Sequence, residues 1–389
     1  MSASRALPKQ PALPNQNGED MKSGVAPTIS IAGRHIGEEY PPYVIAELSA
    51  NHNGSLETAL RIVDAAKKAG ADAVKLQTYR PDTITLNSDL PDFRIEGGLW
   101  GGKTLYELYQ WAHMPWDWHK PLFDHAQSVG LTIFSSPFDT TAVDLLEDLN
   151  APAYKIASFE AVDLPLIKYA ASTGKPLIVS TGMASQDEIG EVIEAARSGG
   201  CSELAILHCV SGYPAPAEHY NLMTIRDMID RFGTVVGLSD HTLDNTTAIA
   251  AVALGASIIE KHVTLDRRGG GPDDSFSLEP EGLAALTDEA QRCRAALGQV
   301  TYQVQASEAE NQKFRRSLYV VKPIARGERF SAENVKSIRP GFGLPPKHYE
   351  SLIGLAAPRD FAVGEPVPRD ILAVRGSVSQ DAVKFDDVS

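Results

Sequence analysis

Cysteine is scarce in this sequence, and its spacing excludes several kinds of site. The three cysteines are Cys201, Cys209 and Cys293, and their separations match neither a metal site nor a redox pair. Their odd number argues against a disulfide framework.

Positive charge is also in short supply, because the net charge at pH 7 is −14. No large cationic surface can form, which argues against nucleic acid as a general partner. An anionic small molecule stays compatible with this balance, provided that Lys, Arg and backbone N–H groups gather locally around it.

Long apolar runs are missing as well. No stretch approaches the length of a membrane span, and residues 1–28 lack the apolar centre of a signal peptide. Residues 1–28 are rich in Pro, Asn, Ser and Gly and are expected to be a disordered tail, and residues 376–389 form a second tail. We therefore expect a cytoplasmic protein without a membrane partner.

Common nucleotide-binding motifs are absent too, since no G-x-G-x-x-G or Walker sequence opens a helix. What is present is an alternation of apolar runs with amphipathic helical stretches from about residue 43 to 298. The apolar runs are 43–48, 72–78, 131–136, 153–158, 176–181, 204–209, 235–240 and 257–263. Eight strand-plus-helix units in series predict an α/β fold of the (β/α)8 TIM-barrel type rather than an open doubly wound sheet.

The alternation breaks after Ala309, which indicates a second domain. We expect the barrel to occupy residues 29–300, a linker residues 301–316, and a small β-rich domain residues 317–375. Within that last region, PIARGERF (323–330) is echoed by DFAVGEPV (360–367) as a weak internal repeat.

The segment 79–118 is too long for an ordinary barrel loop and carries all four tryptophans of the chain. Long loops on the C-terminal face of a barrel usually shape substrate pockets. The segment could instead be a packed excursion on the surface.

Polar residues at the C-terminal ends of barrel strands are the ones that meet a substrate. Those positions hold Glu47, Lys75, Gln77, Ser135, Ser136, Lys155, Ser158, Glu160, Ser180, Thr181, His208, Ser239, Asp240, His241 and His262. Almost every predicted strand thus ends in a group that can ionise or hydrogen-bond, a concentration that predicts an active site. His208 is expected to be a core residue.

Lys75 and Lys155 lie on two different predicted strands, each inside an apolar run. A lysine inside a barrel must be paired or must hold an anion, because an unpaired buried ammonium is costly. Hydroxyls of Ser158, Ser180 and Ser239 surround the same barrel end. Two cations with hydroxyls suit a phosphate and a carboxylate together, the charge pattern of phosphoenolpyruvate. Either lysine alone could instead form a structural pair with an internal glutamate.

His241 and His262 end neighbouring strands, so their imidazoles can share one divalent metal. Asp240 and Glu260 are close enough in sequence to support these ligands. A single strand-end histidine could instead have a hydrogen-bonded structural role.

Further candidates surround this end of the barrel. Glu47 could bind sugar hydroxyls or transfer protons, or it could simply form a salt bridge with Lys75. Asp273 or Asp274, in the Gly-rich segment 266–277, could reach a substrate hydroxyl. Tyr213 could contact a sugar or serve in the core.

Seven motifs in this order resemble the sialic acid synthase family over about residues 35–373. They are AELSANHNGS, AVKLQT, FSSPFD, AYKIASFE, STGM, GLSDHT and EKHVTLD. The region 317–374, including RPGFG at 339–343, resembles the antifreeze-like (SAF) domain of that family.

The resemblance implies a condensation of phosphoenolpyruvate with an N-acylated amino sugar, with phosphate released by C–O cleavage and Mn²⁺ or Mg²⁺ required. It implies that Lys75, Gln77, Lys155, Ser158, Ser180 and Ser239 bind phosphoenolpyruvate, and that His241 and His262 bind the metal. It places Glu47, Glu160, Tyr213 and Asp273 toward the sugar or the reacting centre, with Glu47, Asp273, Lys75 and Lys155 as catalytic residues. Arg339 matches an arginine that reaches the partner subunit's site, which implies a domain-swapped homodimer.

Within the family, the insertion RIEGGLWGGKTLYELYQWAHMPWDWH resembles the pseudaminic acid synthases. Their acceptor is 2,4-diacetamido-2,4,6-trideoxy-L-altrose, whose methyl and acetamido groups suit an apolar pocket. The same chemistry would also serve N-acetylneuraminate or legionaminate synthesis.

Three different functions also remain compatible with these residues. They are a Schiff-base aldolase using Lys75 or Lys155, a synthase acting on an aldose phosphate, and a carbohydrate-binding protein with an inert barrel. The aldose phosphate would need a second phosphate site, for which the sequence offers no extra basic cluster. An inert barrel is disfavoured by the full set of polar residues at the strand ends.

Overall fold

The computed structural model describes residues 26–373, which divide into two compact units at Gly298. Residues 1–25 of the predicted N-terminal tail and all of the predicted C-terminal tail lie outside the described residues. The first unit is a closed barrel of eight parallel strands, which confirms the predicted fold class. Within residues 26–373, no helix has both the length and the apolar character that crossing a bilayer requires.

Each predicted apolar run forms one barrel strand, and the order around the barrel follows the sequence until β10 closes against β3. The strands are β3 (Tyr43–Glu47), β4 (Ala73–Thr78), β5 (Thr132–Pro137), β6 (Tyr154–Ile156), β7 (Leu177–Ser180), β8 (Leu204–Cys209), β9 (Val235–Asp240) and β10 (Ile258–His262). Closure leaves the barrel without an edge strand and brings the C-terminal ends of all eight strands to one rim.

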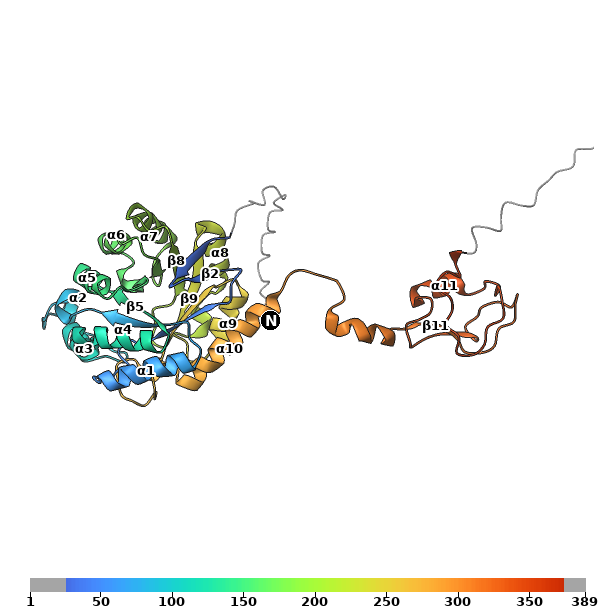
Figure 1. Cartoon of the computed structure of the whole chain (residues 1–389), viewed down its shortest axis with the longest axis horizontal. Coiled ribbons are helices and arrows are strands. Elements are labelled where there is room, and N and C mark those ends of the chain that lie inside the picture. Colours follow the sequence, from blue (N-terminus) through green and yellow to red (C-terminus); the bar gives the residue numbers. More distant parts are fainter. Residues whose placement is uncertain (1–25, 374–389) are drawn as a thin grey trace, which may run out of the picture. The chain divides into compact units, whose positions relative to one another are not determined.

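A helix follows each strand and covers the outside of the barrel (Figure 1). These helices are α1 (Leu56–Lys68), α4 (His119–Ser128), α5 (Thr140–Asp148), α6 (Leu164–Ala171), α7 (Gln186–Ser198), α8 (Met223–Phe232), α9 (Thr246–Ala253) and α10 (Pro280–Leu297). Their starts are specified locally, as in α7, where Ser185 and Glu188 form a reciprocal capping box. Gly70 follows α1 with φ +83°, a conformation that favours glycine.

A β-hairpin that the strand pattern did not predict precedes the barrel. It pairs β1 (Thr28–Ile31) with β2 (Arg34–Gly37) in antiparallel register. Its Ile29, Ile31 and Ile36 are buried in one cluster with inward-facing barrel residues such as Phe134 and Ile178. The hairpin therefore covers interior residues of the barrel, so the predicted active site must lie at a part of the barrel that the hairpin does not cover.

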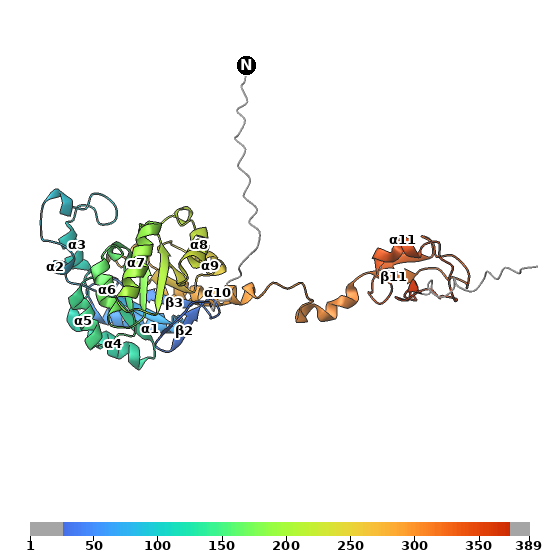
Figure 2. The same cartoon turned by 90° about the horizontal axis from the view of Figure 1, so that it is seen from above.

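The long segment between β4 and α4 has its own short elements and projects beyond the ring of helices (Figure 2). They are α2 (Pro81–Ile84), η1 (Pro91–Phe93), α3 (Leu105–Ala112) and η2 (Trp116–Trp118). Thr104 and Glu107 form a capping box that fixes the start of α3.

The second unit, described over residues 299–373, is a small domain with its own core. It contains η6 (Ala306–Phe314), β11 (Ser317–Val320), β12 (Val335–Ile338), η7 (Pro346–His348) and α11 (Tyr349–Leu352). The two copies of the internal repeat pair with each other, since Ile324 and Phe361 exchange backbone hydrogen bonds of 3.0 and 2.8 Å. Both residues lie in the core of this unit.

Candidate active site

The structure brings the predicted strand-end residues of the barrel together at its C-terminal rim. Most of them are buried despite their polarity. The predicted strand-end residues in this group are Glu47, Lys75, Gln77, Lys155, Ser158, Glu160, Ser180, Ser239, His241 and His262, and the predicted Tyr213 and Asp273 join them from the loops after β8 and β10. Arg339 follows β12 in the second unit with an exposed side chain, and its role at an active site stays a prediction.

The two lysines share a carboxylate, that of Glu260 in β10. Its Oε1 lies 3.4 Å from Nζ of Lys155 and its Oε2 lies 3.9 Å from Nζ of Lys75. Lys75 also lies 2.5 Å from Oε2 of Glu47. Both lysines therefore do pair with internal glutamates, as the structural alternative for a single lysine had suggested. Glu260 faces the barrel interior and these lysines, whereas its place in the sequence suggested support for the histidines.

These four buried charges shift one another's pKa values. Burial raises the pKa of Glu47, in part against the lowering effect of Lys75, to about 7. Burial also favours the neutral form of Glu260, but Lys155 and Lys75 outweigh that effect and lower its pKa. Burial lowers the pKa of Lys155 despite Glu260. One of the two carboxyl groups is thus poised to carry a proton near neutral pH, while the other stays ionised.

Nζ of Lys75 donates to the hydroxyl of Ser136 at 3.1 Å, and the three serines predicted to bind the ligand lie at or just after the ends of other strands at the same end of the barrel. Ser239 donates to Oε1 of Glu260 at 3.0 Å, and the hydroxyl of Ser158 accepts from the backbone N–H of Gly182 at 3.1 Å. Among the described residues, the buried hydroxyl of Ser180 has no hydrogen-bond partner. A cluster of cations, hydroxyls and one unsatisfied hydroxyl is suited to binding an anion with several oxygens.

A chain of hydrogen bonds leads from this cluster to the Gly-rich segment after β10. Gln77 donates to Oε1 of Glu47 and to the hydroxyl of Ser49, both at 2.9 Å. Ser49 in turn donates to Oδ2 of Asp273 at 2.5 Å. Glu47 and Asp273 are thereby coupled through two neutral side chains. Ser49 follows β3 directly but was not predicted, because its position one residue beyond the apolar run gave no signal.

The two histidines lie side by side, with ring centroids 5.4 Å apart. His241 Nδ1 bonds to the carbonyl of Val210 at 2.8 Å, while the buried Nδ1 of His262 has no hydrogen-bond partner among the described residues. Burial and the neighbouring His241 hold the pKa of His262 well below its usual value, so that its imidazole is neutral. Tyr213 packs on His241 with ring centroids 4.4 Å apart.

A neutral, unsatisfied imidazole beside a second imidazole fits a divalent metal with open coordination positions. Within residues 26–373, no group of three or more His, Cys, Asp or Glu side chains could hold a metal ion by itself. Water or substrate would have to supply the other ligands. The carboxylate of Asp240 makes no direct contact with these imidazoles, although its place in the sequence had suggested one, because it lies 2.8 Å from Nζ of Lys261 instead.

A cavity of about 340 Å³ opens beside His262 and is lined by both polar and apolar residues. Its polar lining includes Gln77, Glu160, Tyr213, His262 and Asp273, all of them predicted. Its apolar lining includes Tyr79, Ile84, Ile95, Trp100, Leu105, Leu108, Tyr109 and Phe138. Much of the apolar lining comes from the long segment 79–118, which therefore shapes a pocket as predicted.

The tryptophans of that segment have different environments. Trp100 lines the cavity, lies 5.8 Å from the ring of Tyr213 and donates to the carbonyl of Pro272 at 2.9 Å. Trp116 stacks under the guanidinium of Arg80 at 3.7 Å, and Trp111 is 43% exposed. The apolar character of the cavity thus depends more on leucine, isoleucine and tyrosine than the tryptophan count suggested.

Two family models match this chain. The NeuB family model matches residues 62–302, and the SAF domain model matches residues 315–373. Among curated relatives, pseudaminic acid synthase of Campylobacter jejuni subsp. jejuni serotype O:2 is 46% identical over 323 residues, covering 83% of this chain and 94% of that protein. Pseudaminic acid synthase of Helicobacter pylori is 43% identical over 331 residues, covering 85% and 97%.

A solved structure is also similar over most of the chain. It is the N-acetylneuraminic acid synthetase from Leptospira borgpetersenii serovar Hardjo-bovis in complex with citrate, with a TM-score of 0.67 and 31% identity. The similarity covers 75% of this chain and 96% of that chain.

Proposed function

The chain belongs to the NeuB family and is a phosphoenolpyruvate-dependent synthase of the sialic acid type, and we propose that its acceptor is 2,4-diacetamido-2,4,6-trideoxy-L-altrose. The products would be pseudaminic acid and phosphate. The observation that carries the acceptor is the apolar lining of the cavity beside the two histidines. Likeness to two pseudaminic acid synthases over at least 83% of this chain supports the same acceptor.

Phosphoenolpyruvate fits the buried charge cluster. Lys75 and Lys155 are 3% and 2% exposed, and when Glu47 carries a proton, Glu260 alone cannot neutralise both. The carboxylate and phosphate of the ligand would complete this pairing, with the hydroxyls of Ser158, Ser180 and Ser239 as neutral donors.

Gln77 is already engaged at this end of the barrel. It donates to Glu47 and Ser49 in the structure, so its predicted contact with phosphoenolpyruvate would require one of those bonds to be exchanged.

The acceptor sugar has groups that match both the apolar and the polar residues lining the cavity. Its methyl and acetamido methyl groups would contact the lining from Leu105, Leu108 and Tyr109, which offers few polar atoms. Its hydroxyl and amide groups would face Glu160 and Asp273. An apolar wall is a poor partner for the hydroxyls that mannosamine carries at the corresponding positions, since buried hydroxyls without partners are costly.

His241 and His262 would hold a divalent ion, Mn²⁺ or Mg²⁺, and Asp273 Oδ2 lies 3.9 Å from Nδ1 of His262. When bound, the ion would supply Lewis-acid polarisation of an oxygen of the open-chain sugar aldehyde. The chain contributes two imidazole ligands, one of them fixed by its hydrogen bond to Val210.

The proposed reaction forms one carbon–carbon bond and breaks one carbon–oxygen bond. C3 of phosphoenolpyruvate attacks the aldehyde carbon, and cationic character develops at C2. The former aldehyde oxygen takes up a proton and becomes a hydroxyl, while water adds at C2 and loses a proton. The resulting tetrahedral centre then expels phosphate with its bridging oxygen, and its remaining hydroxyl proton passes to that phosphate. Lys75 and Lys155 would stabilise the departing phosphate, and Glu47, with its pKa near 7, could accept the proton of the added water.

We also propose a domain-swapped homodimer in the cytoplasm, in which Arg339 of one subunit reaches the site of the other. The family resemblance and the exposure of Arg339 support this arrangement. Co-expression of an Arg339→Ala chain with a Lys155→Met chain tests it. Mixed dimers with one intact site should recover part of the activity that each variant lacks alone, and no recovery would contradict the exchange.

A Schiff-base mechanism has one observation in its favour. Burial lowers the pKa of Lys155, as it does for lysines that form Schiff bases. Borohydride reduction in the presence of substrates would trap such an adduct, and mass spectrometry would locate it. The condensation proposed here forms no imine and predicts no trapped adduct.

The function is tested with the full chain, phosphoenolpyruvate carrying ¹⁸O in its bridging position, Mn²⁺ and the diacetamido-trideoxy-altrose. One equivalent of phosphate should appear for each sugar acid formed, with the label in the phosphate. Label retained in the sugar acid would contradict C–O cleavage, and absence of both products would contradict the synthase activity with this acceptor.

A further inference from the structure

A buried ion pair stands directly behind the two candidate metal ligands. Asp240 precedes His241 and Lys261 precedes His262, and these two charged residues are register partners in β9 and β10. Nζ of Lys261 lies 2.8 Å from Oδ2 of Asp240, and their side chains are 2% and 0% exposed. Because successive strand residues point to opposite faces, the pair lies on the other side of the barrel wall from the interior-facing imidazoles.

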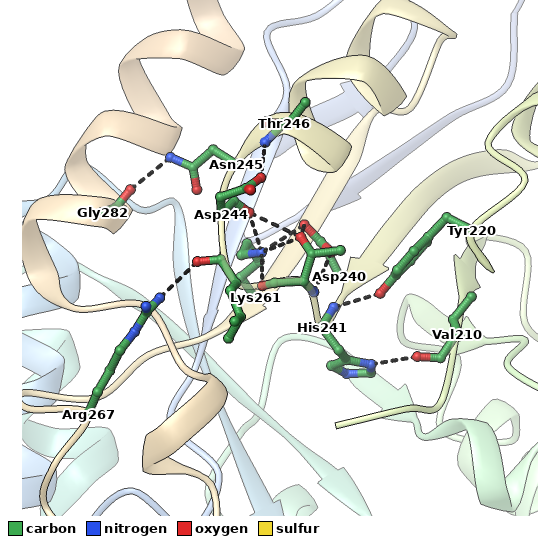
Figure 3. Close-up of polar contacts among 12 residues, drawn as sticks. Val210, Tyr220, Asp240, His241, Asp244, Asn245, Thr246, Lys261, Arg267 and Gly282 are labelled. Carbon is green, nitrogen blue, oxygen red and sulfur yellow. Dashed lines mark hydrogen bonds and ion pairs between the residues drawn. The ribbon is translucent and has the colours of Figure 1, made fainter. Parts of the chain in front are cut away.

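The ammonium of Lys261 binds more than its ion-pair partner. It donates to the carbonyls of Thr242 and Asp244, both at 2.8 Å, and lies 3.3 Å from the hydroxyl of Thr242. Four oxygen atoms therefore surround a group with three N–H donors (Figure 3). Three of these oxygens, from Thr242 and Asp244, belong to the segment between β9 and α9, which begins at His241.

His241 itself is fixed from two directions. Its backbone N–H donates to the hydroxyl of Tyr220 at 2.7 Å, and its ring bonds to the carbonyl of Val210. The two residues that flank His241 in the chain also bond to each other, since the Asp240 carboxylate accepts from the backbone N–H of Thr242 at 2.9 Å. Figure 3 shows His241 at the centre of these contacts, with its ring turned toward Val210 and away from Lys261.

We propose that the Asp240–Lys261 pair is a positioning device that holds His241 and His262 at the spacing a shared divalent metal requires. This inference rests on the metal binding in the proposed function. Stability alone is a weak explanation for the pair, because apolar residues of similar volume often stabilise a buried position equally well. The pair instead ties the ends of two neighbouring strands, each one residue before a ligand, and it fixes the backbone that follows one of them.

The test measures Mn²⁺ affinity of the full chain without substrates, by electron paramagnetic resonance of the free ion, together with thermal unfolding. The variants are Asp240→Asn, Lys261→Met and the combination of both. Thr242→Val removes only a hydroxyl of the same network and serves if the others fold poorly. The matched control is Asn245→Ala, which removes a 3.1 Å bond from the same segment to the carbonyl of Gly282 but none to the ion pair. His241→Ala with His262→Ala defines the loss of the site.

The proposal expects Mn²⁺ affinity to fall about ten- to a hundredfold in the ion-pair variants, less in Thr242→Val and not in Asn245→Ala. Wild-type affinity in the ion-pair variants would overturn the inference and leave the metal site intact. An equal loss in Asn245→Ala would also overturn it, because any loosening of the segment would then suffice. A wild-type chain that binds no Mn²⁺ would refute the metal part of the proposed function and this inference with it, whereas the synthase activity is measured independently.

Discussion

The ammonium of Lys75 and the carboxylate of Glu47 lie 2.5 Å apart at adjacent strand ends, with side chains only 4% and 1% exposed. A ligand anion that binds Lys75 must compete with this carboxylate or bind when Glu47 is protonated. Since burial raises the pKa of Glu47 to about 7, both protonation states are accessible near neutral pH. The pair therefore couples the binding of an anion to the position of a proton.

Replacing Glu47 by glutamine should separate these two roles. Lys75 would lose its competing anion, so the KM for phosphoenolpyruvate should not rise. Loss of the proton acceptor should lower kcat by about a hundredfold or more. Steady-state kinetics at saturating acceptor measure both values. A raised KM with unchanged kcat would assign Glu47 a purely structural role at Lys75.

Substitutions at Lys155 test whether the buried lysines bind substrate or serve only as ion-pair partners of Glu260. Lys155→Met should destabilise the fold by about 3–5 kcal/mol, because Glu260 loses its nearer partner. Adding Glu260→Gln should restore much of that stability by removing the uncompensated charge. The KM for phosphoenolpyruvate should nevertheless rise at least tenfold in both variants. If the double variant bound phosphoenolpyruvate like the wild type, Lys155 would be a structural partner alone.

The buried carboxyl group of Glu160 should make the free energy of unfolding depend on pH. Burial raises its pKa from 4.5 to about 7 in the folded chain, so the folded state holds its proton where the unfolded state has lost it. This contribution is complete below pH 4.5 and is lost as the pH rises through about 7, at no more than about 1.4 kcal/mol per pH unit.

Urea unfolding of wild type and Glu160→Gln between about pH 5 and 8 checks this expectation. The free energy of unfolding of the wild type should fall relative to the variant as the pH rises. Glu194→Gln, at an exposed position on α7, controls for the substitution itself. A difference between wild type and Glu160→Gln that does not change with pH would contradict the assignment.

A substitution at Leu105 tests whether the apolar lining of the cavity determines acceptor specificity. Leu105→Ser should lower kcat/KM for the diacetamido-trideoxy-altrose about tenfold or more, because a methyl contact in an apolar pocket contributes roughly 1–3 kcal/mol to discrimination. Trp111→Ala is the matched control on the same helix, since Trp111 is 43% exposed and does not line the cavity. Equal effects of the two substitutions would remove Leu105 from the determinants of specificity.

The barrel and the gathering of polar residues at its rim were predictable because both follow from local pattern. Apolar runs at regular intervals identify the strands, and the last polar residue of each run identifies the rim. The outward position of Asp240 was also within reach, since it alternates with the inward-facing Ser239. The prediction that Asp240 directly contacts the histidines relied on nearness in sequence and neglected strand periodicity.

Further features depend on contacts between distant parts of the chain. Glu260 on β10 reaches Lys75 on β4 and Lys155 on β6 because the strands close into one barrel whose interior these side chains share, which sequence pattern does not specify. The hairpin β1–β2 is too short and too close to the predicted tail to show a strand pattern. The apolar cavity wall combines residues from α2, α3 and several loops, and its composition follows from how the long segment folds back on the barrel.

The acceptor is the central claim, and a comparison of two sugars tests it most directly. Phosphate release from phosphoenolpyruvate is followed with Mn²⁺ and either the diacetamido-trideoxy-altrose or N-acetylmannosamine, and kcat/KM is compared. The account predicts turnover with the altrose and a kcat/KM for mannosamine lower by at least about a hundredfold, as several lost apolar contacts and buried hydroxyls require. Equal or greater turnover with mannosamine would contradict the proposed acceptor while leaving the family activity in place.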